Sequence, residues 1–182
     1  GVTFRNLIGA PLFSTIQNDD GICKVHDFTT ASETKIVVQQ NGTSVIRALN
    51  GDAELSNITI HGYIEGGGHV GAFFAYSWSG NCKNITINNC TSDANIVSTT
   101  SEPAAAYCGF PMGNPTIYFN NSSFTGNIYT KNGINRYIYT AQGGQGTWFV
   151  DGISVTNNNP QYDSLKCFDI ATINPVVTET GY

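Results

Sequence analysis

The sequence predicts an all-β protein in which short strands wind into a solenoid of about six similar coils, and two observations lead to this fold class. The first is a repeat: β-rich runs begin at Asn57, Asn84 and Thr116, so they are 27 and then 32 residues apart. The second is that no window of eleven or more residues keeps the 3.6-residue period of a helix. Short strands without helices between them indicate parallel coils. One coil must stack on its neighbours to bury its apolar face.

Three successive rounds of this repeat supply the central coils. Their opening runs are residues 57–60, 84–87 and 116–119, their second runs are 63–64, 95–97 and 127–129, and their closing runs are 70–76, 104–110 and 136–141. We expect Ile58, Ile85 and Ile117 to lie directly above one another in successive coils. Phe73 and Phe74 are adjacent, so a strand would direct one side chain inward and the other outward.

The segments on either side of the central rounds continue the same pattern. Before the central rounds, strands are predicted at residues 1–7, 11–14, 25–28, 35–38 and 44–49. After them, strands are predicted at 147–150, 152–156 and 165–170. Turn signals lie at residues 18–21, 50–52, 142–146 and 157–160. No break marks a second domain, so we expect residues 1–182 to form a single β-helical domain.

The composition limits the possible partners. Only 12% of the residues are charged, about half of the usual share, and the formal net charge is −5. The eight Lys and Arg residues are scattered singly, which argues against binding to nucleic acid or to an anionic membrane surface. No apolar run reaches the ~18 to 20 residues of a membrane-spanning helix, so no membrane insertion is expected. The chain begins at Gly1 without a signal peptide, and we interpret it as a mature product or a segment of a longer protein.

Five cysteines are consistent with an oxidising compartment. They are Cys23, Cys82, Cys90, Cys108 and Cys167. Without a C-x-x-C motif, zinc and thioredoxin-like chemistry are not expected. Cys82 and Cys90 flank one predicted strand and are the local candidates for a disulfide, although the sequence does not fix the pairing and an odd number leaves one thiol over. Cys108 is equally well explained as a small core residue.

Six N-x-S/T sequons favour the secretory route and an extracellular or cell-surface location. They begin at Asn41, Asn57, Asn84, Asn89, Asn120 and Asn121. Asn41, in a Gln-Asn-Gly turn, is the strongest candidate for a glycan. The others have a structural alternative. Asn57 and Asn84 would start core strands, and Asn89, Asn120 and Asn121 lie where stacked coils often carry inward-facing amide ladders.

Two stretches carry a family resemblance: His-Val-Gly-Ala-Phe-Phe-Ala-Tyr at residues 69–76, and residues 85–96, which begin Ile-Thr-Ile-Asn-Asn-Cys. They look like the GLUG-type repeats of microbial and protist surface proteins, in which a G-x-V-G-G-F-x-G-like strand precedes an I-x-N-C-x-x-x-G-x-I stretch. The whole pattern resembles the right-handed parallel β-helix. The resemblance covers residues 57–140 and departs from the family pattern at 109–111 and 136–141. It implies an extracellular, adhesin-like repeat module without catalytic residues.

Candidate catalytic residues are few. His26 and Asp27, with His61 one coil above, are a conceivable acid–base group, but neighbours along a strand face opposite sides. The remaining acidic candidates are explained by turns or lack a basic partner: Asp19, Asp20, Asp151, Asp163 and Asp169. No nucleophile, metal-binding or phosphate-loop motif occurs. We therefore predict a protein that is not an enzyme and has no metal site and no cofactor.

Aromatic residues are abundant on the closing strands. Phe73, Tyr107, Tyr137 and Tyr139 can share one face. Stacking in the interior is the favoured interpretation. An exposed ribbon for sugars or for another subunit is the alternative. Trp78, in a predicted turn, is the aromatic residue most expected to be exposed.

The open ends of a stacked coil suggest a function. Their unpaired backbone groups can accept another strand, and neither terminus offers a helical cap. The sequence therefore predicts a non-catalytic structural glycoprotein module that assembles with copies of itself into a fibre or surface layer, with residues 176–177 reaching a neighbour. The first alternative is an adhesin module that binds glycans through an aromatic face. A polysaccharide-active enzyme is less favoured, and an ice-binding face is more remote because regular T-x-T ladders are missing.

Overall fold

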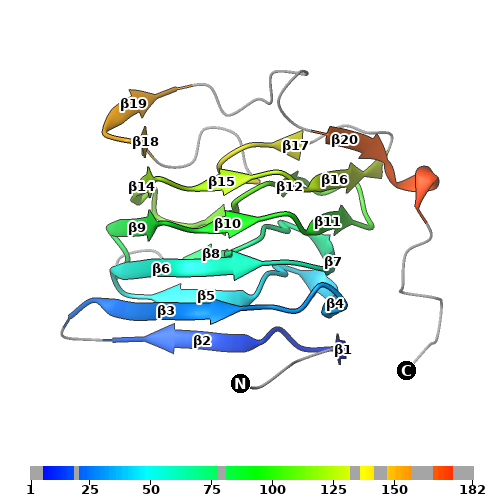
Figure 1. Ribbon diagram of the computed structural model, residues 1–182, viewed down its shortest axis with the longest axis horizontal. Coiled ribbons are helices and arrows are strands. Elements are labelled where there is room, and N and C mark those ends of the chain that lie inside the picture. The colour runs from blue at the N-terminus through cyan, green and yellow to red at the C-terminus, as the bar shows by residue number, and fades with distance from the viewer. Residues whose placement is uncertain are drawn as a thin grey trace.

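The chain forms a β-solenoid of about four turns in the computed structural model, so the predicted fold class is confirmed (Figure 1). The structure describes residues 6–18, 21–77, 81–131, 136–141, 147–156 and 166–173. The expected six coils are too many. Six parallel strands lie one above another only in the six-stranded sheet; the four-stranded sheet stops at four, and the last winding turns back as a hairpin.

Three sheets, whose strands are parallel except for one at the C-terminal end, run along the solenoid (Figure 1). The six-stranded sheet contains β1 (Asn6–Ile8), β4 (Lys35–Asn41), β7 (Tyr63–Gly68), β11 (Asn95–Ser98), β16 (Asn127–Thr130) and β20 (Lys166–Asp169). The four-stranded sheet contains β2 (Phe13–Gln17), β5 (Ile46–Asn50), β8 (Phe74–Ser77) and β13 (Cys108–Pro111). The eight-stranded sheet contains β3 (Cys23–Thr29), β6 (Ala53–Ile60), β9 (Asn84–Asn88), β10 (Thr91–Ser92), β14 (Thr116–Asn120), β15 (Ser123–Phe124), β18 (Thr147–Val150) and β19 (Ile153–Val155). A short pair, β12 (Ala104–Ala105) and β17 (Arg136–Tyr137), completes the set.

The register of the eight-stranded sheet corrects one predicted alignment. Ile85 lies opposite Ile117, as expected from their spacing of 32 residues. Ile58 lies opposite Phe28 instead, and Ala53 is the residue below Ile85. The predicted alignment of Ile58 with Ile85, 27 residues later, is therefore wrong, although Ile58, Ile85 and Ile117 are all buried in one core cluster.

Aromatic side chains stack along the interior, which confirms the favoured interpretation for Phe73, Tyr107 and Tyr139, while Tyr137 is half-buried on β17. The rings of Phe73 and Tyr107 are 5.9 Å apart, those of Tyr107 and Tyr139 6.2 Å, and those of Tyr139 and Trp148 5.9 Å. Phe73 and Phe74 are both buried, so the expectation of one inward and one outward ring is wrong. Strand alternation does not apply to this pair, because β8 begins only at Phe74.

All five cysteines carry free thiols, so the expected disulfide is absent. Cys82 and Cys90 lie on either side of β9, and an extended strand with a rise of ~3.3 Å per residue separates them by far more than a disulfide can span. Burial raises the pKa of Cys82 to about 12 and the pKa of Cys108 well above its ordinary value. The buried thiols therefore stay protonated and pack as small core residues, as predicted for Cys108.

The last winding ends in a hairpin that reverses the chain. β18 and β19 pair antiparallel, with Val150 opposite Ile153. Asp151 and Gly152 form the turn with φ of 47° and 81°, which is the two-residue turn that matches the twist of a hairpin. The prediction that a turn explains the acidic candidate Asp151 is confirmed. β19 is the only antiparallel strand among the described residues.

The described residues contain no α-helix. A 3-10 turn, η2 (Ile170–Thr172), follows β20, and the Asp169 carboxylate accepts a hydrogen bond from the Ala171 backbone at 2.8 Å. In this part of the chain, no helix has the length and apolar character needed to cross a membrane.

Candidate functional site

A column of Asn and Asp residues, here called the amide ladder, lies on the outside of the eight-stranded sheet where each coil bends. Its members are Asp27, Asn57, Asn89, Asn121 and Asp151. Their φ angles lie between 45° and 58°, in the left-handed region that Asn and Asp adopt more readily than other non-glycine residues. The sequence therefore places Asn or Asp at this bend at separations of 30, 32 and 32 residues, and Asp151, in the hairpin turn, follows 30 residues after Asn121.

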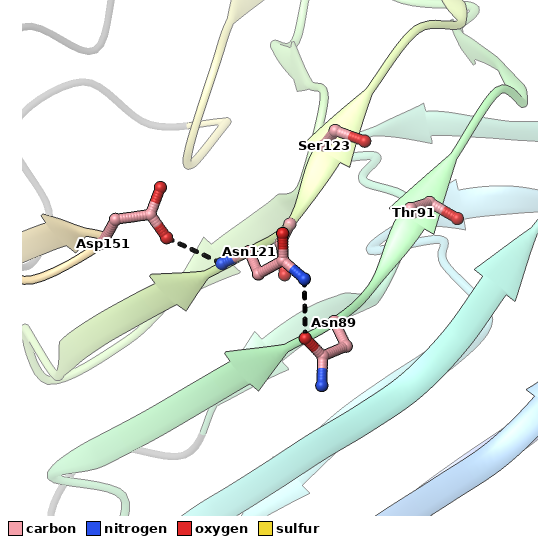
Figure 2. A pocket seen from close by; sticks show the side chains of 6 residues that line it. Asn89, Thr91, Asn121, Ser123 and Asp151 are labelled. Atoms are coloured by element: carbon pink, nitrogen blue, oxygen red, sulfur yellow. Dashed lines mark hydrogen bonds between the residues drawn. The ribbon is translucent and has the colours of Figure 1, made fainter.

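Hydrogen bonds connect the ladder from coil to coil. The Asn57 amide donates to Asp27 Oδ1 at 2.8 Å, the Asn89 amide to Asn57 Oδ1 at 3.4 Å, and the Asn121 amide to Asn89 Oδ1 at 2.8 Å. The Asn121 backbone donates to Asp151 Oδ1 at 2.7 Å (Figure 2). The bond from Asn57, followed by one from His26, lowers the pKa of Asp27. Every amide donates towards the N-terminal coil, and a carboxylate stands at each end of the ladder.

A shallow depression of about 290 Å³ follows the C-terminal part of the ladder (Figure 2). It is lined by Asn89, Thr91, Asn121, Ser122, Ser123 and Asp151. Amide and hydroxyl groups of this kind can hydrogen-bond a polar ligand. Among the described residues of the lining, Asp151 is the one that ionises, so these residues form no acid–base pair and no nucleophile with its base.

Three of the six sequons begin on the ladder, at Asn57, Asn89 and Asn121. The residue after each Asn packs at least partly inward, and the next presents a hydroxyl in the column Thr59, Thr91 and Ser123. The Asn-x-Ser/Thr pattern thus follows from the geometry of the bend. Neighbouring coils are ~4.8 Å apart, so glycans on adjacent ladder residues would collide.

The other sequon residues occupy different surroundings. The Asn120 amide is half-buried and donates to Asn88 Oδ1 at 2.7 Å. Asn84 is exposed at the start of β9, as predicted, and its amide donates to Asp52 Oδ2 at 3.1 Å. Asn41 is exposed at the end of β4. The expectation of inward-facing ladders is wrong for Asn89 and Asn121, because the left-handed bend turns their side chains outward; Asn57 lies at the same bend instead of starting a strand.

The histidine and aspartate candidates form two separate surface pairs. His26 Nδ1 lies 2.8 Å from Asp27 Oδ2, so these neighbours do meet, because the left-handed φ of Asp27 takes its side chain off the strand alternation. His61 Nδ1 lies 2.7 Å from Asp93 Oδ1 and does not join them. Exposed pairs of this kind contribute little to stability. In the described part of the chain, no three His, Cys, Asp or Glu residues converge to hold a metal ion.

The two ends of the solenoid carry the exposed apolar side chains. Among the described residues, the exposed large hydrophobic side chains are Ile8, Phe13, Ile22, Ile153 and Phe168. The first three belong to the first winding, and the last two to the last winding. The windings between them keep their large apolar side chains covered where they are described.

The six-stranded and eight-stranded sheets also end at these windings, whereas the four-stranded sheet begins at the first winding and ends at β13. Among the described strands, β1, β2 and β3 each pair on one side only, with β4, β5 and β6. At the other end, β20 pairs only with β16, and the eight-stranded sheet ends at β19. Several candidates from the sequence lie outside the described residues: Trp78, Asp19, Asp20, Asp163 and the tail at 176–177.

Sequence reasoning placed an amide ladder at Asn89 and Asn121 but missed its outward direction and its other members, and it missed the exposed apolar residues at the two ends. The ladder has a signal, Asn or Asp followed two residues later by Thr or Ser, at residues 27, 57, 89 and 121. The end residues Ile8 and Phe168 have no such sequence signal, because their exposure depends on whether another coil lies next to them and not on the local sequence pattern.

The fold and these surfaces define the protein as a β-solenoid with a polar outer ladder, a core with free thiols and apolar ends. No family model, curated protein or solved structure matches the chain. The similarity to GLUG-type repeats therefore stays a prediction from residues 57–140.

Proposed function

We propose that the protein is a non-catalytic structural module that associates with copies of itself through the open ends of its solenoid, forming a fibre or surface layer. The observation that carries the proposal is that, among the described residues, the exposed large apolar side chains are confined to the two terminal windings. Removing such apolar side chains from contact with water is favourable. Unpaired strand edges also supply backbone groups with which another copy can pair.

The proposal includes an extracellular or cell-surface location and N-glycosylation. Its support is the set of sequons, of which Asn41 and Asn84 are exposed and lie away from the amide ladder. The ladder supplies a structural reason for the sequons at Asn57, Asn89 and Asn121, so these three are weaker support for N-glycosylation. The resemblance to surface-protein repeats points the same way.

The alternative, a glycan-binding adhesin module, has less support. It relied on an exposed aromatic face, whereas Phe73 and Tyr107 are buried and Tyr137 and Tyr139 are half-buried. Two polar depressions remain as surfaces for a sugar. One lies beside Asp151, and the other, of about 560 Å³, is lined by Asn18, Gly21, Ile22, Gly51, Asp52, Asn81 and Lys83. A polysaccharide-active enzyme would need acidic and basic groups that converge, and the described His–Asp pairs are separate surface contacts.

Self-association is tested on the purified protein by light scattering after gel filtration over a wide range of concentrations, together with electron microscopy. We expect regular polymers whose length rises with concentration. The control is Thr91→Lys, which adds a charge to an exposed position on a middle winding and should assemble like the wild type. A protein that stays monomeric at every concentration, or polymers abolished equally by the control, would contradict the proposal.

A further inference from the structure

Resting on the proposed self-association, we infer that copies of the chain join head to tail through the six-stranded sheet. The β1 edge of one copy would pair with the β20 edge of the next. The eight-stranded sheet, in contrast, ends within each copy.

The first argument is that two exposed apolar residues stand at opposite ends of one column. In register, this column contains Ile8, Val37, Glu65, Val97, Tyr129 and Phe168. Ile8 is 60% exposed and Phe168 is 40% exposed. A neighbouring copy that continues the sheet in register places Phe168 of one copy beside Ile8 of the next, ~4.8 Å away between strands. Both side chains then lose much of their contact with water.

The second argument is that the inward column beside it continues equally well. Leu7 and Cys167 are its two end members, and each is partly buried against the core. Head-to-tail stacking sets Leu7 over Cys167 and extends the core across the junction. The pairing within the sheet is parallel throughout, and translation along the solenoid axis keeps it parallel. A two-fold arrangement would instead set like edges antiparallel and Ile8 against Ile8.

The third argument is that the eight-stranded sheet is closed at its C-terminal end. The hairpin of β18 and β19 replaces the next parallel strand with an antiparallel one. The amide ladder also cannot continue, because its ends are Asp27 and Asp151. Ionised carboxylates accept hydrogen bonds but cannot donate them, and two of them repel each other. This sheet therefore resists a second copy while the six-stranded sheet accepts one.

The test uses lysine at the two edges, Ile8→Lys and Phe168→Lys, because a charge on an edge strand opposes pairing. We expect each variant alone to be monomeric under conditions in which the wild type polymerises. An equimolar mixture should give a one-to-one dimer and nothing longer, since only one intact β1 edge and one intact β20 edge remain. Ile153→Lys is the matched control: it changes the most exposed of these residues, at 69%, on the closed sheet, and should polymerise normally.

Each other outcome overturns a stated part of the account. Dimers of a single variant would show that like ends pair, which contradicts head-to-tail joining. Loss of assembly in Ile153→Lys, with none in the edge variants, would place the contact on the eight-stranded sheet. A wild-type protein that never assembles contradicts the proposed function itself. Circular dichroism checks that each variant is folded. If a lysine variant is unfolded, the serine variant at the same position, Ile8→Ser or Phe168→Ser, is used in its place.

Discussion

The inward columns and the amide ladder repeat together in each coil, but they stabilise the solenoid in different ways. Leu55, Ile87 and Phe119 succeed one another in one inward column and are essentially fully buried. A large apolar side chain buried in this way contributes ~1.5 to 3 kcal/mol. The ladder is exposed, and a hydrogen bond contributes only ~0.5 to 1.5 kcal/mol net. The interior thus supplies most of the stability, while the ladder fixes which residue of one coil lies above which residue of the next.

The largest effect should come from Phe119→Ala. The Phe119 ring lies 4.8 Å from the ring of Tyr107 and 5.1 Å from that of Tyr139, so its removal leaves a cavity inside the aromatic stack. We expect the free energy of unfolding to fall by ~3 to 5 kcal/mol. Urea unfolding followed by circular dichroism measures it. A loss below ~1 kcal/mol would mean that the interior does not dominate.

A smaller effect is expected from Asn89→Ala in the ladder. The change removes the coil-to-coil amide bonds and forces alanine to a φ of 51°, where a side chain with a Cβ is disfavoured. We expect a loss of ~2 kcal/mol in the same assay. Asn89→Gly removes the same amide without the backbone cost and should lose ~1 kcal/mol. A glycine variant as stable as the wild type would show that the ladder bonds contribute nothing.

The contribution of Asp52, another polar contact between coils, should depend on pH. Its Oδ1 accepts hydrogen bonds from the backbone N–H groups of Lys83 at 2.7 Å and Asn84 at 2.8 Å. Partial burial opposes ionisation, yet the bonds from Asn84 and Lys83 together leave the pKa of Asp52 below its ordinary value. Because the folded-state pKa is lower than the unfolded one, the carboxylate stabilises the fold above the unfolded pKa. This stabilisation is lost as the pH falls through the folded pKa.

The comparison of wild type with Asp52→Asn measures this contribution. The wild type should be more stable at about pH 6 by less than ~1 kcal/mol, because the carboxylate is largely accessible to water. The difference should shrink as the pH falls through the folded-state pKa, because the carboxyl group then becomes protonated in both states. A difference independent of pH would contradict the role of the charge.

The smallest effect is expected from Thr91→Val in the hydroxyl column. The Thr91 hydroxyl donates to Thr59 Oγ1 at 3.3 Å in full contact with water, and valine suits a strand. We expect a change within ~0.5 kcal/mol. This variant also removes the sequon at Asn89 while leaving the Asn89 amide in place. In a secretory host it therefore distinguishes the effect of the ladder hydrogen bonds on stability from the effect of a glycan. A loss similar to that of Asn89→Ala would assign the stability of this face to the hydroxyls.

The fold class could be predicted because strands without helices and a repeated pattern leave few alternatives. The alignment of the coils could not, because Asn-Ile-Thr-Ile occurs twice, at residues 57–60 and 84–87, in different structural positions. The first copy spans the left-handed bend at Asn57, whereas the second is an unbroken strand beginning at Asn84. Alternation of apolar and polar residues does not distinguish them. The two copies differ only in which residues of the neighbouring coils they pair with, and tertiary packing determines this pairing.

The stack of Phe73, Tyr107, Tyr139 and Trp148 also makes the last winding optically visible. Rings about 6 Å apart in series pass excitation efficiently to the indole, and Trp148 is only 4% exposed. Trp78 is the other tryptophan, so a Trp78→Phe protein would emit from a single buried site. Its emission would report on fraying of the C-terminal winding separately from the cooperative melting of the whole.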